Sequence, residues 1–311
     1  MGCAAGVTAA KALARDATPP SLPLIDSHTH FYDPARPEGV PWPPKDDAVL
    51  YRPVFPREWE RLVEPIGPAG TIVVEASPWV EDNQWLLDLA ERHAAERLPG
   101  MLGIVGVVGN LPLDDADCGK LIDRFASHRL FRGIRTHGDK VLAGLQDSTY
   151  AGHVARLVER DLTLDLNGGD AFAAADSLAT RFPSLRIVID HLGNTRITPD
   201  GPTAEWLGAV GKVAVHPNVF MKLSGLVESA ARSMQVSKPP TQAGFYERWL
   251  EAVWKAFGER RLLFGSNWPV ADRAASYGDV HALAASFVRG RGAEAERWLF
   301  NAASQAAYRW G

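Results

Sequence analysis

The sequence predicts a single-domain α/β protein, an eight-stranded (β/α)8 TIM barrel. Short runs of β-branched residues alternate with amphipathic helical stretches from residue 22 onward. This alternation predicts parallel strands joined by right-handed helical crossovers. Eight such runs occur, and they end in polar residues. Eight units favour a closed barrel over its rival, a doubly wound open sheet.

The expected strands share β-branched composition and a polar end. They are Leu22–His28, Thr71–Ser77, Leu102–Val108, Phe131–His137, Leu162–Asn167, Arg186–His191, Asn218–Ser224 and Arg261–Asn267. Glycines interrupt the third run and weaken its strand signal. Stretches with helical spacing lie between the strands, at Asn83–Arg97, Gly119–His128, Tyr150–Arg160 and Phe245–Phe257.

Three further segments complete the expected barrel. Asn301–Gly311 has the pattern of a closing helix. Tyr32–Pro56 and Glu228–Gly244 are irregular, and both follow the carboxyl end of an expected strand. Active-site loops of barrels lie at these strand ends, so both segments are expected to border the site.

Composition excludes several classes of protein. The chain has 311 residues and a net charge of −4, which is not the basic footprint of a nucleic-acid-binding protein. No apolar run approaches the roughly 18 residues of a membrane span. The two cysteines, Cys3 and Cys118, are too few for a disulfide scaffold or a cysteine zinc site. The expected partner is therefore a small molecule, and the sequence specifies no oligomeric state.

Residues 1–20 are Ala-rich and end in two prolines. They are interpreted as a disordered tail or a residual leader that precedes the barrel at 21–311. The expected location is cytoplasmic. Export is the alternative if residues 1–14 are the remnant of a signal, since Ala12-Leu13-Ala14 resembles a cleavage site.

Ionisable side chains gather at the expected strand ends. Side chains alternate along a strand, so those of one face can be assigned by parity. The inward face is expected to carry Asp26, His28, His30, Glu75, Arg135, His137, Asp165, Asn167, His191, Lys222, Ser224 and Asn267. Asp190 is expected to turn outward, toward the helices. Burying so many ionisable groups is costly unless they pair or bind a ligand.

The strongest motif is the apolar strand that ends in His28-Thr29-His30. Two imidazoles at this spacing can converge on one metal or one substrate. With it, the chain resembles the amidohydrolase superfamily, and within it the group of 2-pyrone-4,6-dicarboxylate lactonase and sugar-lactone hydrolases. The matching segments are HFYDP from His30, VVEA from Val73, GIR from Gly133, DHLG from Asp190, KLSG from Lys222 and FGSNWP from Phe264.

The resemblance implies a TIM barrel that hydrolyses a cyclic ester. It assigns catalytic positions to His28, His30 and His191, and places Arg135 near the substrate carboxylate or carbonyl. Asn267 stands where these lactonases carry a catalytic aspartate. An amide has no titratable proton acceptor and is a weak metal ligand, so this departure puts the general base in question.

The resemblance also bears on the cofactor. Arg135 and Asn167 stand where metal-rich members of the superfamily carry ligands on strands 4 and 5, so two metal ions are not expected. One divalent ion, zinc or manganese, on His28, His30 and His191 is one expectation. Metal-free chemistry is the other.

The predicted function is the opening of a small sugar-acid or dicarboxylate lactone by water. The base is His191 or His30, else Asp165 or Glu75, else a metal-bound water. Asn267 orients the water or the carbonyl. The expected substrate contacts are Glu75, His137, Asn167, Lys222, Ser224 and Trp268, the last at the pocket rim. Two alternatives are a metal-dependent decarboxylase of the same superfamily and a catalytically weakened barrel that binds a small carbohydrate or acid.

Replacement of Asn267 by aspartate tests the departure from the family pattern. If position 267 is the family's base in a weakened form, Asn267→Asp raises kcat for lactone hydrolysis, because a carboxylate accepts a proton that an amide does not. The measurement is kcat of both proteins on one lactone. A fall in kcat would show that asparagine is present for its own chemistry.

Overall fold

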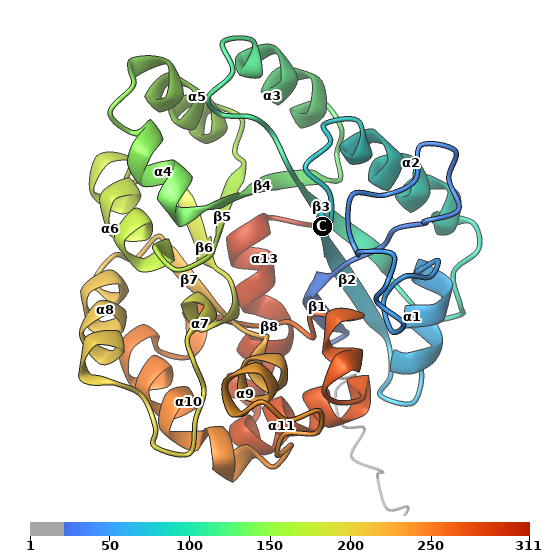
Figure 1. Cartoon of the computed structure of the whole chain (residues 1–311), viewed down its shortest axis with the longest axis vertical. Coiled ribbons are helices and arrows are strands. Elements are labelled where there is room, and N and C mark those ends of the chain that lie inside the picture. The colour runs from blue at the N-terminus through green and yellow to red at the C-terminus, as the bar shows by residue number, and fades with distance from the viewer. Residues whose placement is uncertain (1–21) are drawn as a thin grey trace, which may run out of the picture.

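The computed structural model describes residues 22–311, which form one eight-stranded barrel (Figure 1). All neighbouring strands pair in parallel and in chain order. The first and last strands meet through a bridge between Thr29 and Trp268, with a 2.9 Å bond from His30 N to Trp268 O. The predicted fold is therefore confirmed. The predicted tail at 1–20, with Cys3, lies outside the described residues.

All eight expected strands are present, and most differ from the expected bounds by one to three residues. They are β1 Leu24–Thr29, β2 Ala69–Val74, β3 Gly103–Gly109, β4 Phe131–His137, β5 Thr163–Asn167, β6 Arg186–Ile189, β7 Val219–Leu223 and β8 Leu262–Phe264. The glycine-rich third strand forms as expected.

Helices cover the outer face of the barrel, and the last of them, α13, closes one end of it. They are α1 Pro56–Val63, α2 Asp82–Ala94, α3 Cys118–Ala126, α4 Gly138–Gly144, α5 Ser148–Glu159, α6 Ala171–Arg181, α7 His191–Asn194, α8 Ala204–Ala214, α9 Leu226–Met234, α10 Ala243–Phe257, α11 Tyr277–Arg289, α12 Ala293–Arg297 and α13 Ala303–Tyr308. Short turns are η1 Glu259–Arg261, η2 Val270–Arg273 and the π-helical η3 Trp298–Ala302. No helix of the described residues is long and apolar enough to cross a membrane.

Two apolar layers hold the barrel together. The larger lies between strands and helices, and the smaller fills the barrel interior around Ile25, Ile72 and Val188. The closing helix α13 contributes Ala303, Ala307 and Tyr308 to the interior layer. In Figure 1 this helix lies across the middle of the barrel. It therefore plugs the end of the barrel opposite the active-site loops.

The structure corrects two expectations. Val188 belongs to the interior layer, so the next residue of the same parity, Asp190, turns inward and not toward the helices. Strand β6 ends at Ile189, and His191 has a left-handed backbone (φ 53°). The alternation of side chains along the strand therefore does not extend to His191. The segment Glu228–Gly244 is not irregular throughout, because α9 extends to Met234.

Candidate active site

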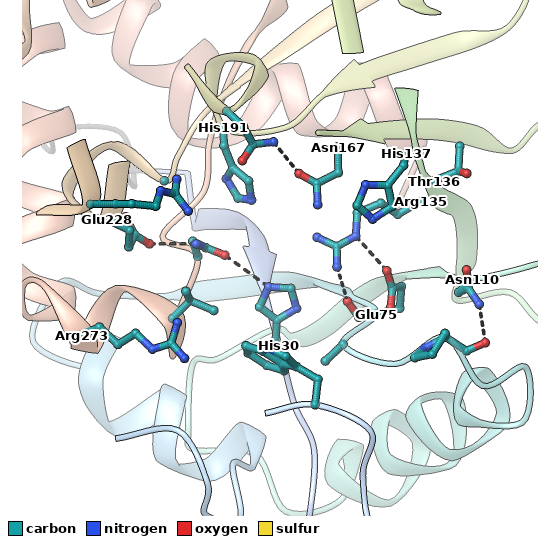
Figure 2. Close-up of a pocket in the computed structure, with 18 of the residues that line it drawn as sticks. His30, Glu75, Asn110, Arg135, Thr136, His137, Asn167, His191, Glu228 and Arg273 are labelled. Atoms are coloured by element: carbon teal, nitrogen blue, oxygen red, sulfur yellow. Dashed lines mark hydrogen bonds and ion pairs between the residues drawn. The ribbon is translucent and has the colours of Figure 1, made fainter. Parts of the chain in front are cut away.

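A cavity of about 500 Å³ opens at the carboxyl ends of the strands (Figure 2). Its walls come from β4, β5 and the segments that follow β1, β2, β3, β4, β6, β7 and β8. Seven predicted site residues line it: His30, Glu75, Arg135, His137, Asn167, His191 and Asn267. The barrel thus brings together side chains that are far apart in the sequence.

Two imidazoles, those of His30 and His191, line the cavity, and that of His28 lies beneath them. The ring of His28 lies 4.9 Å from that of His30 and 4.4 Å from that of His191, between centroids. Nδ1 of His30 lies 2.9 Å from the carbonyl oxygen of Val74, and Nε2 lies 3.2 Å from Oδ1 of Asn267. Both partners are acceptors, so a neutral ring donates to only one of them. Burial lowers the pKa of His30 to about 3 and that of His191 to about 4. Both rings are therefore neutral at pH 7.

Arg135 is held rigidly at the opposite wall. Its Nε donates to Glu75 Oε1 at 2.9 Å, and one terminal nitrogen donates to the Glu75 carbonyl at 2.7 Å. The guanidinium faces the open centre of the cavity in Figure 2, across from His30 and His191. Such a preorganised cation is suited to stabilise negative charge that develops on a substrate oxygen.

A fully buried charge cluster lies beneath the cavity. Nζ of Lys222 lies 2.7 Å from Asp165, 3.0 Å from Asp190 and 3.2 Å from Nδ1 of His28. Tyr308 of α13 donates to Asp165 at 2.7 Å. Burial raises the pKa of Asp165 to about 6. Burial also opposes ionisation of Asp190, but Lys222 holds the pKa of that carboxyl well below its ordinary value.

Several predicted site residues lie outside the cavity wall. Of the residues described, His28, Asp165, Lys222 and Ser224 are beneath it, and Ser224 Oγ bonds Nδ1 of His191 at 2.8 Å. The expected place of Trp268 at the rim is wrong. Its side chain is fully buried against Phe31, with ring centroids 6.1 Å apart, because β8 ends before it and the chain turns inward.

Glu228 is a cavity residue that sequence reasoning missed. It lies on the first turn of α9, and its Oε1 accepts a 2.8 Å hydrogen bond from Nδ2 of Asn267. Burial raises the pKa of Glu228 to about 7. The sequence did offer one indication of this role, because Glu228 follows the KLSG segment, which ends at Gly225, by only three residues. The other polar cavity residues that were missed are Asn110, Thr136, Lys140, Asn194, Arg232 and Arg273.

One group of side chains in the described part of the chain could hold a metal ion. It consists of His28, Asp190 and His191, whose ligand atoms all lie within 4.8 Å of one another. Nε2 of His28 is buried and has no hydrogen-bond partner among the described residues. These nitrogen and carboxylate donors fit one zinc ion. This group includes Asp190, whereas the set expected from the sequence has His30 in its place.

Comparisons with known proteins show what the chain is similar to. The amidohydrolase family model matches residues 25–310. An L-fucono-1,5-lactonase of Burkholderia ambifaria is 33% identical over 83% of this chain and 84% of its own. An L-fucono-1,5-lactonase of Burkholderia multivorans is 30% identical over 88% and 91%. The crystal structure of an amidohydrolase from Burkholderia multivorans with bound zinc has a TM-score of 0.79 and 29% identity, and the match covers 93% of this chain and 100% of that one.

The buried cluster predicts a large stability effect at position 222. Lys222→Met leaves Asp165 and Asp190 as neighbouring buried carboxylates without their ammonium, so the free energy of unfolding at pH 7 falls by about 3–5 kcal/mol. The measurement is denaturant unfolding. The control is Lys212→Met on α8, where the exposed pair with Asp176 contributes about 1 kcal/mol or less. Equal losses for the two variants would contradict the prediction.

Proposed function

This chain belongs to the amidohydrolase family, and we propose that it is a lactone hydrolase that opens the cyclic ester of a small sugar acid with water. One observation carries the proposal. The cavity sets a fixed guanidinium, Arg135, opposite neutral imidazoles of His30 and His191. The relatives named L-fucono-1,5-lactonase, matched over most of their length, support the same reaction.

The wall of the cavity suits a hydroxylated ring. Amide side chains of Asn110, Asn167 and Asn194 contribute both donors and acceptors. Trp42 adds an aromatic surface, with its ring centroid 6.0 Å from that of His30. A volume of about 500 Å³ is within the usual range for small-molecule sites. The substrate class that fits is a polar lactone of sugar size.

Two residues of the wall, Arg135 and His191, have tasks in ester hydrolysis. Arg135 stabilises the oxyanion that forms when water adds to the carbonyl. The neutral ring of His191, fixed by Ser224, accepts a hydrogen bond from water or a substrate hydroxyl. If zinc is bound, His28, Asp190 and His191 would hold it, and the ion would act as a Lewis acid toward the carbonyl.

The other two functions gain no support. Neither the decarboxylase nor the weakened barrel is favoured by an observation on the site or by the lactonase relatives. We further propose that residues 21–311 form the catalytic domain and that residues 1–20 are not part of it.

Turnover of lactones tests the proposed function. In a pH-indicator assay we expect the purified protein to hydrolyse L-fucono-1,5-lactone or another γ- or δ-lactone of a sugar acid. Arg135→Met lowers kcat by about 10²–10³-fold, because the oxyanion loses its charged donor. Arg124→Met removes an exposed arginine on α3 and serves as the control. Absence of turnover across sugar and dicarboxylate lactones, with or without zinc, would refute the function.

Metal content tests the donor set. After dialysis against zinc and removal of excess ion, elemental analysis should find no more than one zinc per chain. Asp190→Asn should lower that content, and His30→Ala should retain it. The opposite pattern would show that the set expected from the sequence, His28 with His30 and His191, is right.

A further inference from the structure

One carboxyl group of the cavity has no task in the reaction described so far, that of Glu228. It bonds Asn267, the residue that stands where the sequence resemblance places a catalytic aspartate. The two side chains come from different elements, Glu228 from α9 and Asn267 from the loop after β8. A carboxylate is thus present one hydrogen bond away from the expected position.

The other carboxyl groups of the site are engaged. Asp165 lies beneath the cavity, where Lys222 and Tyr308 bond it. Glu75 accepts a hydrogen bond from Arg135, and protonation of Glu75 would neutralise its carboxylate and break this ion pair. Neither of these carboxyls, nor Asp190, which pairs with Lys222 beneath the cavity, is free to take a proton from water without loss of a structural ion pair.

The imidazoles are poorly matched to the task of general base. An effective base has a pKa near the working pH. Burial places the pKa of His30 at about 3 and that of His191 at about 4, so both are weak bases at neutral pH.

The surroundings of Glu228, in contrast, suit this carboxyl to the task of general base. Oε2 is buried and has no partner among the described residues, whereas Oε1 accepts from Asn267 and retains a second lone pair. Burial raises the pKa of this carboxyl to about 7, while Arg232 on the same helix lowers it and Asp272 on η2 raises it. Tyr246 of α10 also faces the group, and burial keeps this phenol neutral.

We propose that Glu228 is the general base of this site and accepts a proton from the attacking water at Oε1, the oxygen that Asn267 holds at the cavity wall. This rests on the proposed lactone hydrolysis. As the water oxygen bonds to the carbonyl carbon, its proton passes to Glu228 and the carbonyl electron pair moves onto the oxygen facing Arg135. The bond from that carbon to the ring oxygen then breaks, and the ring oxygen takes the proton from Glu228. The product is the open-chain hydroxy acid.

The amide of Asn267 can follow the protonation of Glu228. When Glu228 is charged, Nδ2 donates to it, as in this structure, and the charge on the acceptor outweighs the contact of Oδ1 with Nε2 of His30, an acceptor while Nδ1 of that ring carries the proton. When Glu228 is protonated, the amide turned over accepts that proton at Oδ1, and Nδ2 donates to the bare Nε2 of His30. The amide is therefore a two-way partner that an aspartate could not replace.

Substitution at position 228 tests the proposal. On a lactone that the wild type hydrolyses, Glu228→Gln lowers kcat by about 10²–10⁴-fold with little change in KM. Wild-type kcat rises with pH through about 7, and the variant lacks this dependence. Formate restores activity to Glu228→Ala in proportion to its concentration, because it supplies the missing carboxylate. Asn267→Asp lowers kcat, because two carboxyls in contact share one proton.

Two further measurements separate catalysis from structure. Asp272→Asn removes a negative charge near Glu228, so the kinetic pKa shifts downward while the maximal kcat is retained. Glu228→Gln raises Tm more at pH 8 than at pH 5, because a carboxyl whose pKa rises from 4.5 to about 7 on folding destabilises the folded state above that range.

The possible failures are distinct. A wild type that hydrolyses no lactone refutes the proposed function. A wild type that is active while Glu228→Gln retains its kcat and pH profile refutes the role of Glu228. An inactive Glu228→Gln, with no formate rescue of Glu228→Ala and no effect of Asp272→Asn on the pH profile, also refutes it and assigns Glu228 a structural role.

Discussion

The ammonium group of Lys222, enclosed at the centre of the barrel, is the charge on which the site depends. Lys222, Asp165 and Asp190 have fully buried side chains and come from β7, β5 and the end of β6. An isolated buried charge costs several kcal/mol, so these three groups must stay together in the folded state. Their pairing fixes the register of three strands at the level where the cavity begins. Tyr308 ties the plug helix α13 to the same cluster.

Burial decides which groups of the cavity can carry protons at neutral pH. Burial is the main cause of the low pKa values of His30 and His191, and Arg135 lowers both further. The imidazoles are thereby kept neutral, as hydrogen-bonding groups. Burial also dominates at Glu228, where it raises the pKa of the carboxyl to about 7 although Arg232 lowers it. One low-dielectric cavity therefore holds weak and strong proton acceptors side by side.

Much of this arrangement could be predicted from the sequence, and the exceptions have physical causes. The periodic alternation of strands and helices predicts the barrel, and parity along β4, β5 and β7 correctly turns Arg135, Asp165 and Lys222 inward. The alternation of side chains gave the wrong face for Asp190. Strand β6 is short and carries apolar residues on both faces, so its sequence does not show which face points into the barrel. Glu228 could not be placed, because the path of a helix after a strand end is set by tertiary packing.

The identity of residue 267 follows from its neighbour. Its backbone is left-handed (φ 59°), a conformation that asparagine and aspartate tolerate better than other residues with a side chain. Backbone geometry thus admits either residue, and the choice falls to the contact with Glu228. Aspartate there would place two carboxyls within a hydrogen-bond length, where they cannot both ionise. Asparagine avoids that repulsion and can donate to Glu228. Glu228 on α9 and Asn267 after β8 therefore form one hydrogen-bonded pair. In this pair the carboxylate is supplied by the helix, and the strand end supplies the amide that holds it.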